Sequence, residues 1–350
     1  MCQIVFHLRN FISYGHKETM NQKQEQLQQE YTGRINRAMD YIQQHLTEEL
    51  TLEAVAHAAG FSKFHFHRIF SACVGETLNH FVKRVRVERA AWQLSGNPVK
   101  PVTDIALDCG FSGSASFARA FREIMGVSAS EWRQSGTAQR KDGKQKSKNC
   151  KTDGKARQEF ELAMGEDGWQ STTPTWRIQM KNNNSQSIAL DAEIEVRDMP
   201  DFPVVYVRHV GPYQGDAALF GRLIGKLCDW AGPRALLGPD SRMLMVYHDD
   251  PNITDDDRLR VDVCLTVTGE VEVNGDIGKA TIPGGKFAVG HFEIFQEQYG
   301  DAWDAVMAGF LPKSGFQPDD RLCYEMCLND PATHPEKKHI VDICVPVKPL

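Results

Sequence analysis

Two arginines occupy matching places in a stretch of sequence that occurs twice. Residues 60–70 read GFSKFHFHRIF and residues 110–121 read GFSGSASFARAF, so that Arg68 corresponds to Arg119. An arginine side chain can bond both acceptors on the edge of a guanine base, and His67 can donate or accept a hydrogen bond beside it. Serine and alanine surround Arg119 instead. The two copies therefore share one charge and differ in the other groups that could contact a base.

A single carboxylate near the end of the chain could do a different kind of chemistry. Glu325 lies between Tyr324 and Met326 in an apolar run that is typical of a β-strand. An ionised carboxyl group is costly among apolar side chains unless it is paired, and its pKa rises. Such a group persists more readily when a bound cation or a proton transfer requires it. Glu325 is therefore a candidate ligand-binding residue.

The elements that position the first arginine are predicted by the spacing of apolar residues. Thr51 can cap a helix that ends at Gly60, because glycine tolerates a left-handed turn without steric cost. Phe61 then fills the angle between this helix and the next one. The buried face of the next helix has the spacing i, i+3, i+4, i+7 and comprises Phe66, Ile69, Phe70 and Cys73.

The second copy repeats these elements with one residue added. Gly110 follows Gly60 by 50 residues, whereas Arg119 follows Arg68 by 51. The buried face of its second helix comprises Phe117, Ala120, Phe121 and Ile124. A long helix at about residues 77–94 is predicted between the copies. A last short helix is predicted to begin with a capping box formed by Ser128 and Glu131.

When each helix buries its apolar stripe, several residues are left on its outer face. They are Lys63, Phe64, His67 and Arg68 in the first copy, and Ser114, Ala115, Ala118 and Arg119 in the second. A helix, a short turn with glycine and a second helix is the architecture that places the second helix in a DNA major groove. One such pattern is a weak signal, but two in tandem are a much stronger one. These residues are therefore candidate DNA contacts.

Charge is divided unevenly along the chain. Residues 1–190 contain 25 Lys and Arg against 19 Asp and Glu, a balance of +6. Residues 191–350 contain 15 against 27, a balance of −12. The first part could therefore lie on a polyanion that would repel the second.

Composition also divides the chain into parts. Residues 135–189 include the stretch RKDGKQKSKNCKTDGKARQ, which has too few aliphatic side chains to offset the entropy of ordering. We expect a flexible basic linker there. Residues 1–31 are rich in glutamine and are expected to form a flexible extension. Two folded domains are thus predicted, at residues 32–134 and 190–350.

Several classes of protein are not favoured. The chain has no run of eighteen apolar residues and no signal-peptide core, so we expect a soluble cytoplasmic protein. The nine cysteines form no CxxC pair, which argues against a disulfide framework and against a zinc site. We expect neither a metal nor another cofactor.

The last part of the chain contains an internal repeat of its own. VDVCL at residues 261–265 corresponds to VDICV at residues 341–345, an offset of 80. In each copy a strand, a helix and two alternating strands are predicted, with the helices at about residues 216–230 and 299–311. This pattern predicts a duplicated α+β fold of the type (βαββ)2, whose two halves face each other across a groove.

Residues 35–134 resemble the DNA-binding domain of AraC-type transcription regulators. The resemblance rests on the tandem Gly-Phe-Ser turns, on F-x-R-x-F in both following helices, and on the closing GVSASEWR. It implies an all-α domain in which two helix-turn-helix motifs enter successive major-groove segments of one duplex. It also implies RNA polymerase as a partner and a monomer or weak dimer.

Within that domain, the chemistry of the two copies predicts unequal roles. Arg68 and His67 predict that the first helix reads most of the base sequence. Small residues around Arg119 predict that the second helix mainly positions the protein through phosphate and methyl contacts.

The region from residue 190 to residue 350 resembles the GyrI-like effector-binding domain, which follows an AraC-type domain in several regulators. The motifs that carry the resemblance are HVGPY (209–213), YHDDP (247–251), IPGGKFAV (282–289), LPKSGF (311–316) and YEMCLNDP (324–331). In that family a glutamate at the position of Glu325 lies in the pocket of members that bind aromatic cations. The resemblance therefore implies a small, cationic or amphipathic effector held between aromatic walls. Candidates for these walls are Tyr206, Trp230, Phe287, Phe292 and Trp303.

Three functions stay open for the whole chain. The first is a transcription regulator in which a small molecule that binds residues 190–350 alters DNA or polymerase contacts. The second makes the C-terminal domain a hydrolase of electrophilic small molecules, with Glu325 activating water. The third is a protein-binding or DNA-mimic role for the acidic domain. The presence of this domain beside a predicted DNA-binding domain favours the first function.

Overall fold

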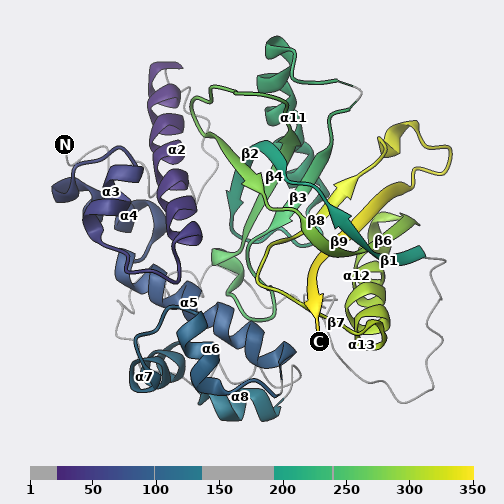
Figure 1. Cartoon of the computed structure of the whole chain (residues 1–350). Helices are drawn as coiled ribbons and strands as arrows, with labels where there is room; N and C mark the ends of the chain where they lie inside the picture. Colours follow the sequence, from purple (N-terminus) through teal and green to yellow (C-terminus); the bar gives the residue numbers. More distant parts are fainter. Residues whose placement is uncertain (1–21, 98, 136–192, 239) are drawn as a thin grey trace, which may run out of the picture.

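The chain folds into a helical domain and a sheet domain that lie side by side (Figure 1). The structure, a computed structural model, describes residues 22–97, 99–135, 193–238 and 240–350. Apart from Ser135, the predicted linker lies outside the described residues. None of the helices in the described ranges combines the length and the apolar content that a membrane crossing needs.

Seven helices of the described chain build the first domain. They are α2 (Gln22–Gln44), α3 (Leu52–Ala58), α4 (Lys63–Val74), α5 (Leu78–Gly96), α6 (Val102–Asp108), α7 (Ser114–Met125) and α8 (Ala129–Ser135). The predicted tandem pairs are confirmed as α3 with α4 and α6 with α7. The predicted long helix between them is α5.

Helix α2 begins earlier than the sequence pattern suggested. Residues 22–31, expected to belong to a flexible extension, are helical. Their glutamines, glutamates and lysine have high helix propensity, although they form no apolar stripe. Arg34 then ties α2 to the first turn, because its Nη1 donates to the carbonyl of Gly60 at 2.9 Å and its guanidinium lies 5.1 Å from the ring centre of Phe61.

Both helix-turn-helix units turn at a glycine in the left-handed region. The φ angle is +68° at Gly60 and +82° at Gly110. A Cβ atom on Gly110 would lie 2.6 Å from the carbonyl oxygen of Leu46, so the close approach of the turn after α2 also demands glycine. Helix α4 begins three residues after its glycine and α7 begins four after its own, which confirms the added residue.

Capping agrees with the sequence at two helix starts. The Thr51 hydroxyl accepts a hydrogen bond from the Ala54 amide at 3.2 Å. At the start of α8, Ser128 and Glu131 form the predicted capping box. Ser62 precedes α4, but its side chain makes no cap hydrogen bond.

Helix α5 takes part in both cores of the helical domain. Its first half contributes Leu78, Phe81 and Val85 to a core shared with α2, α3 and α4. Its second half, from Val87 to Leu94, packs with α6, α7 and α8. A change that moves α5 therefore reaches both helix-turn-helix units.

The second domain is a curved antiparallel sheet with helices on one face. Its strands are β1 (Glu193–Met199), β2 (Phe202–Val210), β3 (Met243–Tyr247), β4 (Arg260–Thr266), β5 (Ile277–Ile282), β6 (Gly285–Ile294), β7 (Phe316–Pro318), β8 (Cys323–Cys327) and β9 (His339–Pro349). The order in the sheet is β1-β6-β9-β8-β3-β4-β2-β5, and β7 pairs with β9.

The predicted duplication is confirmed by this order. One repeat comprises β2, α11 (Ala217–Ala231), β3 and β4. The other comprises β6, a helical segment, β8 and β9. This segment consists of α12 (Tyr299–Asp304), a π-helical stretch (Ala305–Phe310) and α13 (Leu311–Ser314). The two repeats meet where β3 pairs with β8, in a register that places Met245 directly opposite Glu325.

Alternation along the strands decides which side chains face the helices. One cross-strand row comprises Val207, Val263, Met245, Glu325 and Ile343. Val207, Val263 and Met245 pack with α11. The neighbouring row comprises Tyr206, Cys264, Leu244 and Met326, and these side chains pack in a separate core on the other face. Glu325 therefore faces the helix side of the sheet.

Candidate functional site: an exposed pair of helices and a shared cavity

The outer faces of α4 and α7 hold the residues that sequence spacing left unburied. Lys63, His67 and Arg68 are exposed on α4, as are Ser114, Ala115, Ala118 and Arg119 on α7. Phe64 belongs to α4, but its side chain is outside the described part of the structure. In Figure 1 both helices lie on the side of the helical domain that is away from the sheet.

Lys63 forms an ion pair with Glu53 of α3. Its Nζ lies 3.1 Å from Oε1 of Glu53, and about half of each side chain is exposed. An ion pair in such a position contributes about 0–1 kcal/mol, so Lys63 can exchange this partner for another anion.

Arg84 and Arg86 of α5 have structural roles instead. Arg84 is 3% exposed and lies between two carboxylates, with Nη2 2.6 Å from Glu76 and Nη1 2.9 Å from Glu88. Arg86 donates to the carbonyls of Leu46 and Glu48 at 2.8 and 2.7 Å. These side chains fix α5 within the protein and do not extend the exposed surface of α4 and α7.

A cavity of about 1080 Å³ lies on the helix side of the sheet and extends to the helical domain. Its floor includes Met245 and Glu325, and its walls include Phe220 of α11 and Trp303 of α12. Nine of the residues that line it are Asp or Glu and two are Arg. Cavities of roughly 300–1,000 Å³ hold drug-sized ligands, and the excess of carboxylates favours a cation among them.

Glu325 is held at the floor of this cavity by aromatic side chains. It is 6% exposed, and its Oε1 accepts a hydrogen bond of 2.6 Å from Nε1 of Trp303. Burial raises the pKa of Glu325 to about 7, although hydrogen bonds from Trp303 and Tyr247 favour the ionised form. Near neutral pH the group can therefore be either a proton carrier or a counter-ion.

The aromatic wall is built partly from residues that the sequence analysis did not select. The ring of Tyr247 meets Trp303 edge-to-face with centres 5.9 Å apart, and Tyr213 lies 5.7 Å from Tyr247. All three residues line the cavity. Tyr213 ends the motif HVGPY and Tyr247 begins YHDDP, so these motifs carried a signal that the choice of candidate walls did not use.

The other aromatic candidates are not among the residues that line this cavity. Tyr206 and Phe287 lie in the core on the opposite face of the sheet, because strand alternation turns them away from Glu325. Trp230 donates to Asn274 at 2.7 Å and stacks with Arg234 at the far end of α11. Phe292 packs in the core beneath α12. Of the five predicted walls, Trp303 alone contacts Glu325.

A network of ion pairs joins the helical domain to the sheet domain. Arg208 of β2 is paired with Asp40 of α2 at 2.8 Å and with Asp262 of β4 at 2.6 Å. His248 contacts the same Asp262 oxygen at 2.7 Å. Burial opposes the charge on Asp262, but Arg208 and His248 hold the pKa of this carboxyl below its usual range. Tyr206 completes the contact by donating its hydroxyl hydrogen bond to Asp40.

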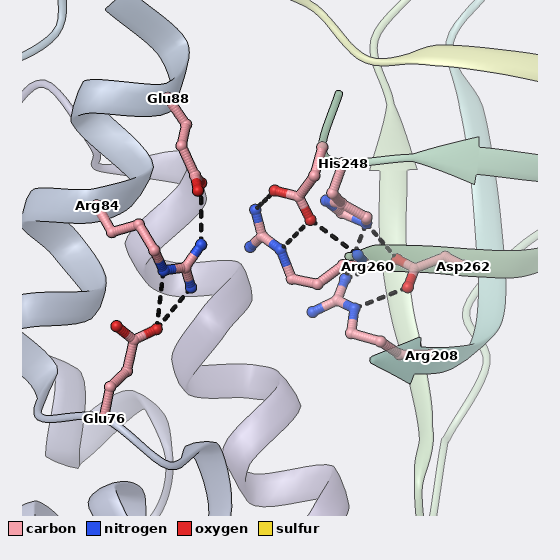
Figure 2. A network of polar contacts seen from close by, with 8 residues as sticks. Glu76, Arg84, Glu88, Arg208, His248, Arg260 and Asp262 are labelled. Atoms are coloured by element: carbon pink, nitrogen blue, oxygen red, sulfur yellow. Dashed lines mark hydrogen bonds and ion pairs between the residues drawn. The ribbon is translucent and has the colours of Figure 1, made fainter. Parts of the chain in front are cut away.

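Figure 2 shows the two sides of this interface. Glu76, Arg84 and Glu88 lie on the helical side, and Arg208, His248, Arg260 and Asp262 lie on the strands opposite. Arg258 reaches Glu76 at 3.6 Å, and the Arg260 guanidinium lies 5.6 Å from the ring centre of Phe81. Sequence reasoning missed these contacts between the domains, since the residues on the two sides are more than 100 positions apart in the chain.

Comparisons with known proteins agree with both domains. Residues 55–135 match a helix-turn-helix domain, and residues 192–348 match a GyrI-like small molecule binding domain. The HTH-type transcriptional activator AarP of Providencia stuartii is 33% identical over 126 residues, which cover 36% of this chain and 86% of AarP. The chain belongs to the AraC-type helix-turn-helix transcription regulators. Its second domain is a GyrI-like domain, as the duplicated sheet also indicates.

Other similar proteins share single domains with this AraC-type chain. An uncharacterised HTH-type transcriptional regulator of Staphylococcus aureus is 35% identical over 100 residues, which cover 29% of this chain. The chain spans only 13% of the length of that relative and of several like it. Among solved structures, the C-terminal domain of EcmrR is 16% identical with a TM-score of 0.40, covering 46% of this chain and all of that one. The DNA-binding domain of AdpA in complex with a target DNA is 25% identical with a TM-score of 0.29, covering 31% and 96%.

Proposed function

We propose that this chain is a sequence-specific DNA-binding transcription regulator whose GyrI-like domain binds a small cationic or amphipathic effector. The observation that supports it most is the pair of exposed, matching residues Arg68 and Arg119 on two helices that one helix, α5, holds together.

DNA binding follows from what the two helices leave exposed. Arg68 and His67 can bond base edges, while Lys63 can exchange Glu53 for a phosphate. Around Arg119, the exposed side chains of Ser114, Ala115 and Ala118 offer one hydroxyl and two methyl groups. We therefore assign base recognition mainly to α4, and phosphate and thymine-methyl contacts mainly to α7. RNA polymerase remains a predicted partner from the family resemblance.

Fluorescence anisotropy with the full chain tests DNA binding. The chain should bind a labelled mixed-sequence duplex at low salt, and the affinity should fall steeply as salt rises, with a log–log slope of about −0.9 per phosphate neutralised. The double variant Arg68→Ala/Arg119→Ala should bind less tightly with a shallower slope. The matched control is Lys313→Ala, which removes a positive charge from the sheet domain. A full chain that binds no duplex at low salt would contradict the proposal.

Effector binding follows from the cavity around Glu325. An ionised Glu325 attracts a cation, and the rings of Tyr247 and Trp303 can each add about 0.5–2 kcal/mol by cation–π contact. A neutral apolar molecule would leave the carboxylate without compensation once the cavity is dry. The effector class supported best is therefore an aromatic or amphipathic cation.

Calorimetric titration with benzyltrimethylammonium tests the effector site. We expect binding to the full chain, weakened at least tenfold in Glu325→Gln, since the amide keeps the shape and loses the charge. Chromatography after incubation with a hydrolysable aromatic cation, the benzoate ester of choline, separates binding from catalysis. Recovery of the intact ester supports an effector site, whereas turnover that Glu325→Gln abolishes would assign a hydrolase instead.

A further inference from the structure

The cavity around Glu325 has walls from both domains. Along one face of α5 it is lined by Val85, Glu88, Arg89, Trp92, Ser95 and Gly96. On α2 it is lined by Gln43, which lies one turn after the interface residue Asp40. The helix that joins the two helix-turn-helix units is therefore also a wall of the effector cavity.

Buried polar atoms without a hydrogen-bond partner in the described chain gather along this shared wall. They are Gln43 Oε1 of α2, Arg89 Nε of α5, His248 Nδ1 at the end of β3 and Thr254 Oγ1 in the loop that follows. All four residues line the cavity, and Thr254 is 4% exposed. Polar atoms buried in this way are costly unless a partner reaches them, so the wall is suited to a ligand with polar groups.

The same loop enters the helical domain. Ile253 is 2% exposed and packs in the core formed by the second half of α5 with α6, α7 and α8. Asp250 shapes the turn, because its carbonyl accepts from the amides of Ile253 and Thr254 at 2.9 Å. A molecule that touches Thr254 therefore touches a segment that is already packed against the second helix-turn-helix unit.

Polar contacts between the domains hold these two walls together. Asp40, one turn before Gln43, pairs with Arg208 at 2.8 Å, and Arg89 pairs with Asp320 at 3.1 Å. Gln93 also donates to Asp320, at 2.7 Å. These contacts fix α5 against the sheet domain.

We propose that the effector spans this cavity, with a cationic group at Glu325 and a hydrogen-bonding group at the wall formed by Gln43, Arg89, His248 and Thr254. The effector then contacts both domains at once and strengthens the contact between them. This inference rests on the proposed effector site and adds its regulation, since a ligand shifts a structure only by contacts that differ between states. The ligand class is an elongated amphipathic cation with a hydroxyl at its far end.

The chemistry of the far wall favours a group that both donates and accepts. Gln43 Oε1 is an acceptor, Arg89 Nε is a donor, and the Thr254 hydroxyl is both. A second cationic group is less suited, because Arg89 supplies a positive charge there. A terminal hydroxyl matches these partners without bringing a charge that must be desolvated.

A compact cation and a series of tailed cations test, on the full chain, whether the effector reaches from Glu325 to the far wall. Benzyltrimethylammonium reaches Glu325 alone, whereas benzyldimethylammonium ions with ω-hydroxyalkyl tails of increasing length can reach the far wall. In calorimetry we expect one tail length to bind more tightly than the compact ion. Gln43→Ala should weaken that ion about three- to tenfold and leave the compact ion unchanged, as expected for one neutral hydrogen bond. Gln44→Ala, the adjacent exposed glutamine of the same helix, should change neither.

Hydrogen exchange on the same samples reports the contact between domains. The best tailed ion should slow amide exchange in α5 and in residues 250–254 more than the compact ion does. If Gln43→Ala unfolds, Thr254→Val supplies the same test from the sheet domain. Tailed ions that bind no better than the compact ion and leave exchange in α5 unchanged would overturn the shared site, while the cation site at Glu325 stands. Failure of both kinds of ion to bind would overturn both proposals.

Discussion

Each domain of this chain contains a duplication, and in both domains the two copies share their core residues. The copies differ at residues that are exposed or that face the cavity. In the sheet domain, Met245 and Glu325 face each other on paired strands, so that one repeat has a thioether where the other has a buried carboxylate. In the helical domain, Phe70 and Phe121 fill corresponding places in two cores, while exposed His67 corresponds to exposed Ala118. In each domain the core residues are repeated. Apart from the matching arginines Arg68 and Arg119, the residues that we assign to ligand or DNA differ between copies.

This difference indicates where function is located in a duplicated fold. A core side chain must satisfy the same packing in both copies, because protein interiors are as dense as organic crystals. An exposed or cavity-facing side chain has no such constraint. Residues at which the two copies disagree are therefore the first candidates for specific chemistry.

The largest expected effect is on stability, from changes in the two corresponding cores of the helical domain. Phe70→Ala and Phe121→Ala should each lower the free energy of unfolding by about 3–5 kcal/mol, since each removes a fully buried ring. Urea unfolding followed by circular dichroism measures both, with Ser114→Ala, at an exposed position of α7, as the control. A loss of unfolding free energy in one variant that is several times the loss in the other would contradict the equivalence of the two cores.

A smaller effect on the free energy of unfolding is expected from Glu325, the carboxylate that stands where the other repeat has Met245. With a pKa of about 7, folded Glu325 keeps its proton between about pH 4.5 and pH 7, whereas the unfolded chain releases it. The unfolded state then binds fewer protons, so this group lowers the free energy of unfolding as pH rises through that window, by about 3 kcal/mol. Glu325→Gln should lack this contribution.

Thermal or urea unfolding at pH 5 and pH 8 measures the difference in free energy of unfolding between wild type and Glu325→Gln. Glu272→Gln, at an exposed carboxylate of the same domain, is the control. A gap between wild type and Glu325→Gln that is the same at both pH values would show that Glu325 titrates alike in the folded and unfolded chain.

The two recognition helices should respond differently to loss of their arginines. Arg68→Ala should cost about 1–3 kcal/mol on a preferred duplex and relax the choice of base, because a bidentate guanine contact is lost. Arg119→Ala should weaken binding by about the same factor for every duplex, and this factor should be smaller than that of Arg68→Ala on its preferred duplex. Competition binding with point-changed duplexes measures both variants. Equal losses of base preference would contradict the assignment of base recognition to α4.

The smallest predicted effect is the pH dependence of cation binding. Since only ionised Glu325 attracts a cation, and about a tenth of it is ionised one pH unit below its pKa, benzyltrimethylammonium should bind about tenfold more weakly at pH 6 than at pH 8. In Glu325→Gln the weaker residual affinity should not vary over this range. Calorimetric titration at the two pH values measures it, and a flat profile in the wild type would move the cation away from Glu325.

Much of the fold followed from spacing within the sequence. The glycine turns, the apolar stripes and the 80-residue offset gave both helix-turn-helix units, the extra residue of the second unit and the (βαββ)2 order, because these depend on local pattern. Glu325 was also identified, since a carboxylate in an apolar strand breaks the pattern. The start of α2 was missed, because Gln-rich helices bury little and show no apolar stripe.

What could not be predicted depends on contacts between distant parts of the chain. Tyr206 and Phe287 were placed beside Glu325, but strand register turns them to the other face. Asp40 meets Arg208 across 168 positions, and only the packing of two domains brings them together. Sequence alone therefore indicated a tether between independent domains, where the structure shows an interface.

Selection of bound duplexes from a randomised library by the full chain, followed by sequencing, tests the central claim most directly. The account predicts one enriched sequence with two segments, of which the one under α4 is more strictly specified, and loss of that segment in Arg68→Ala. A wild-type chain that enriches no sequence at low salt would contradict it.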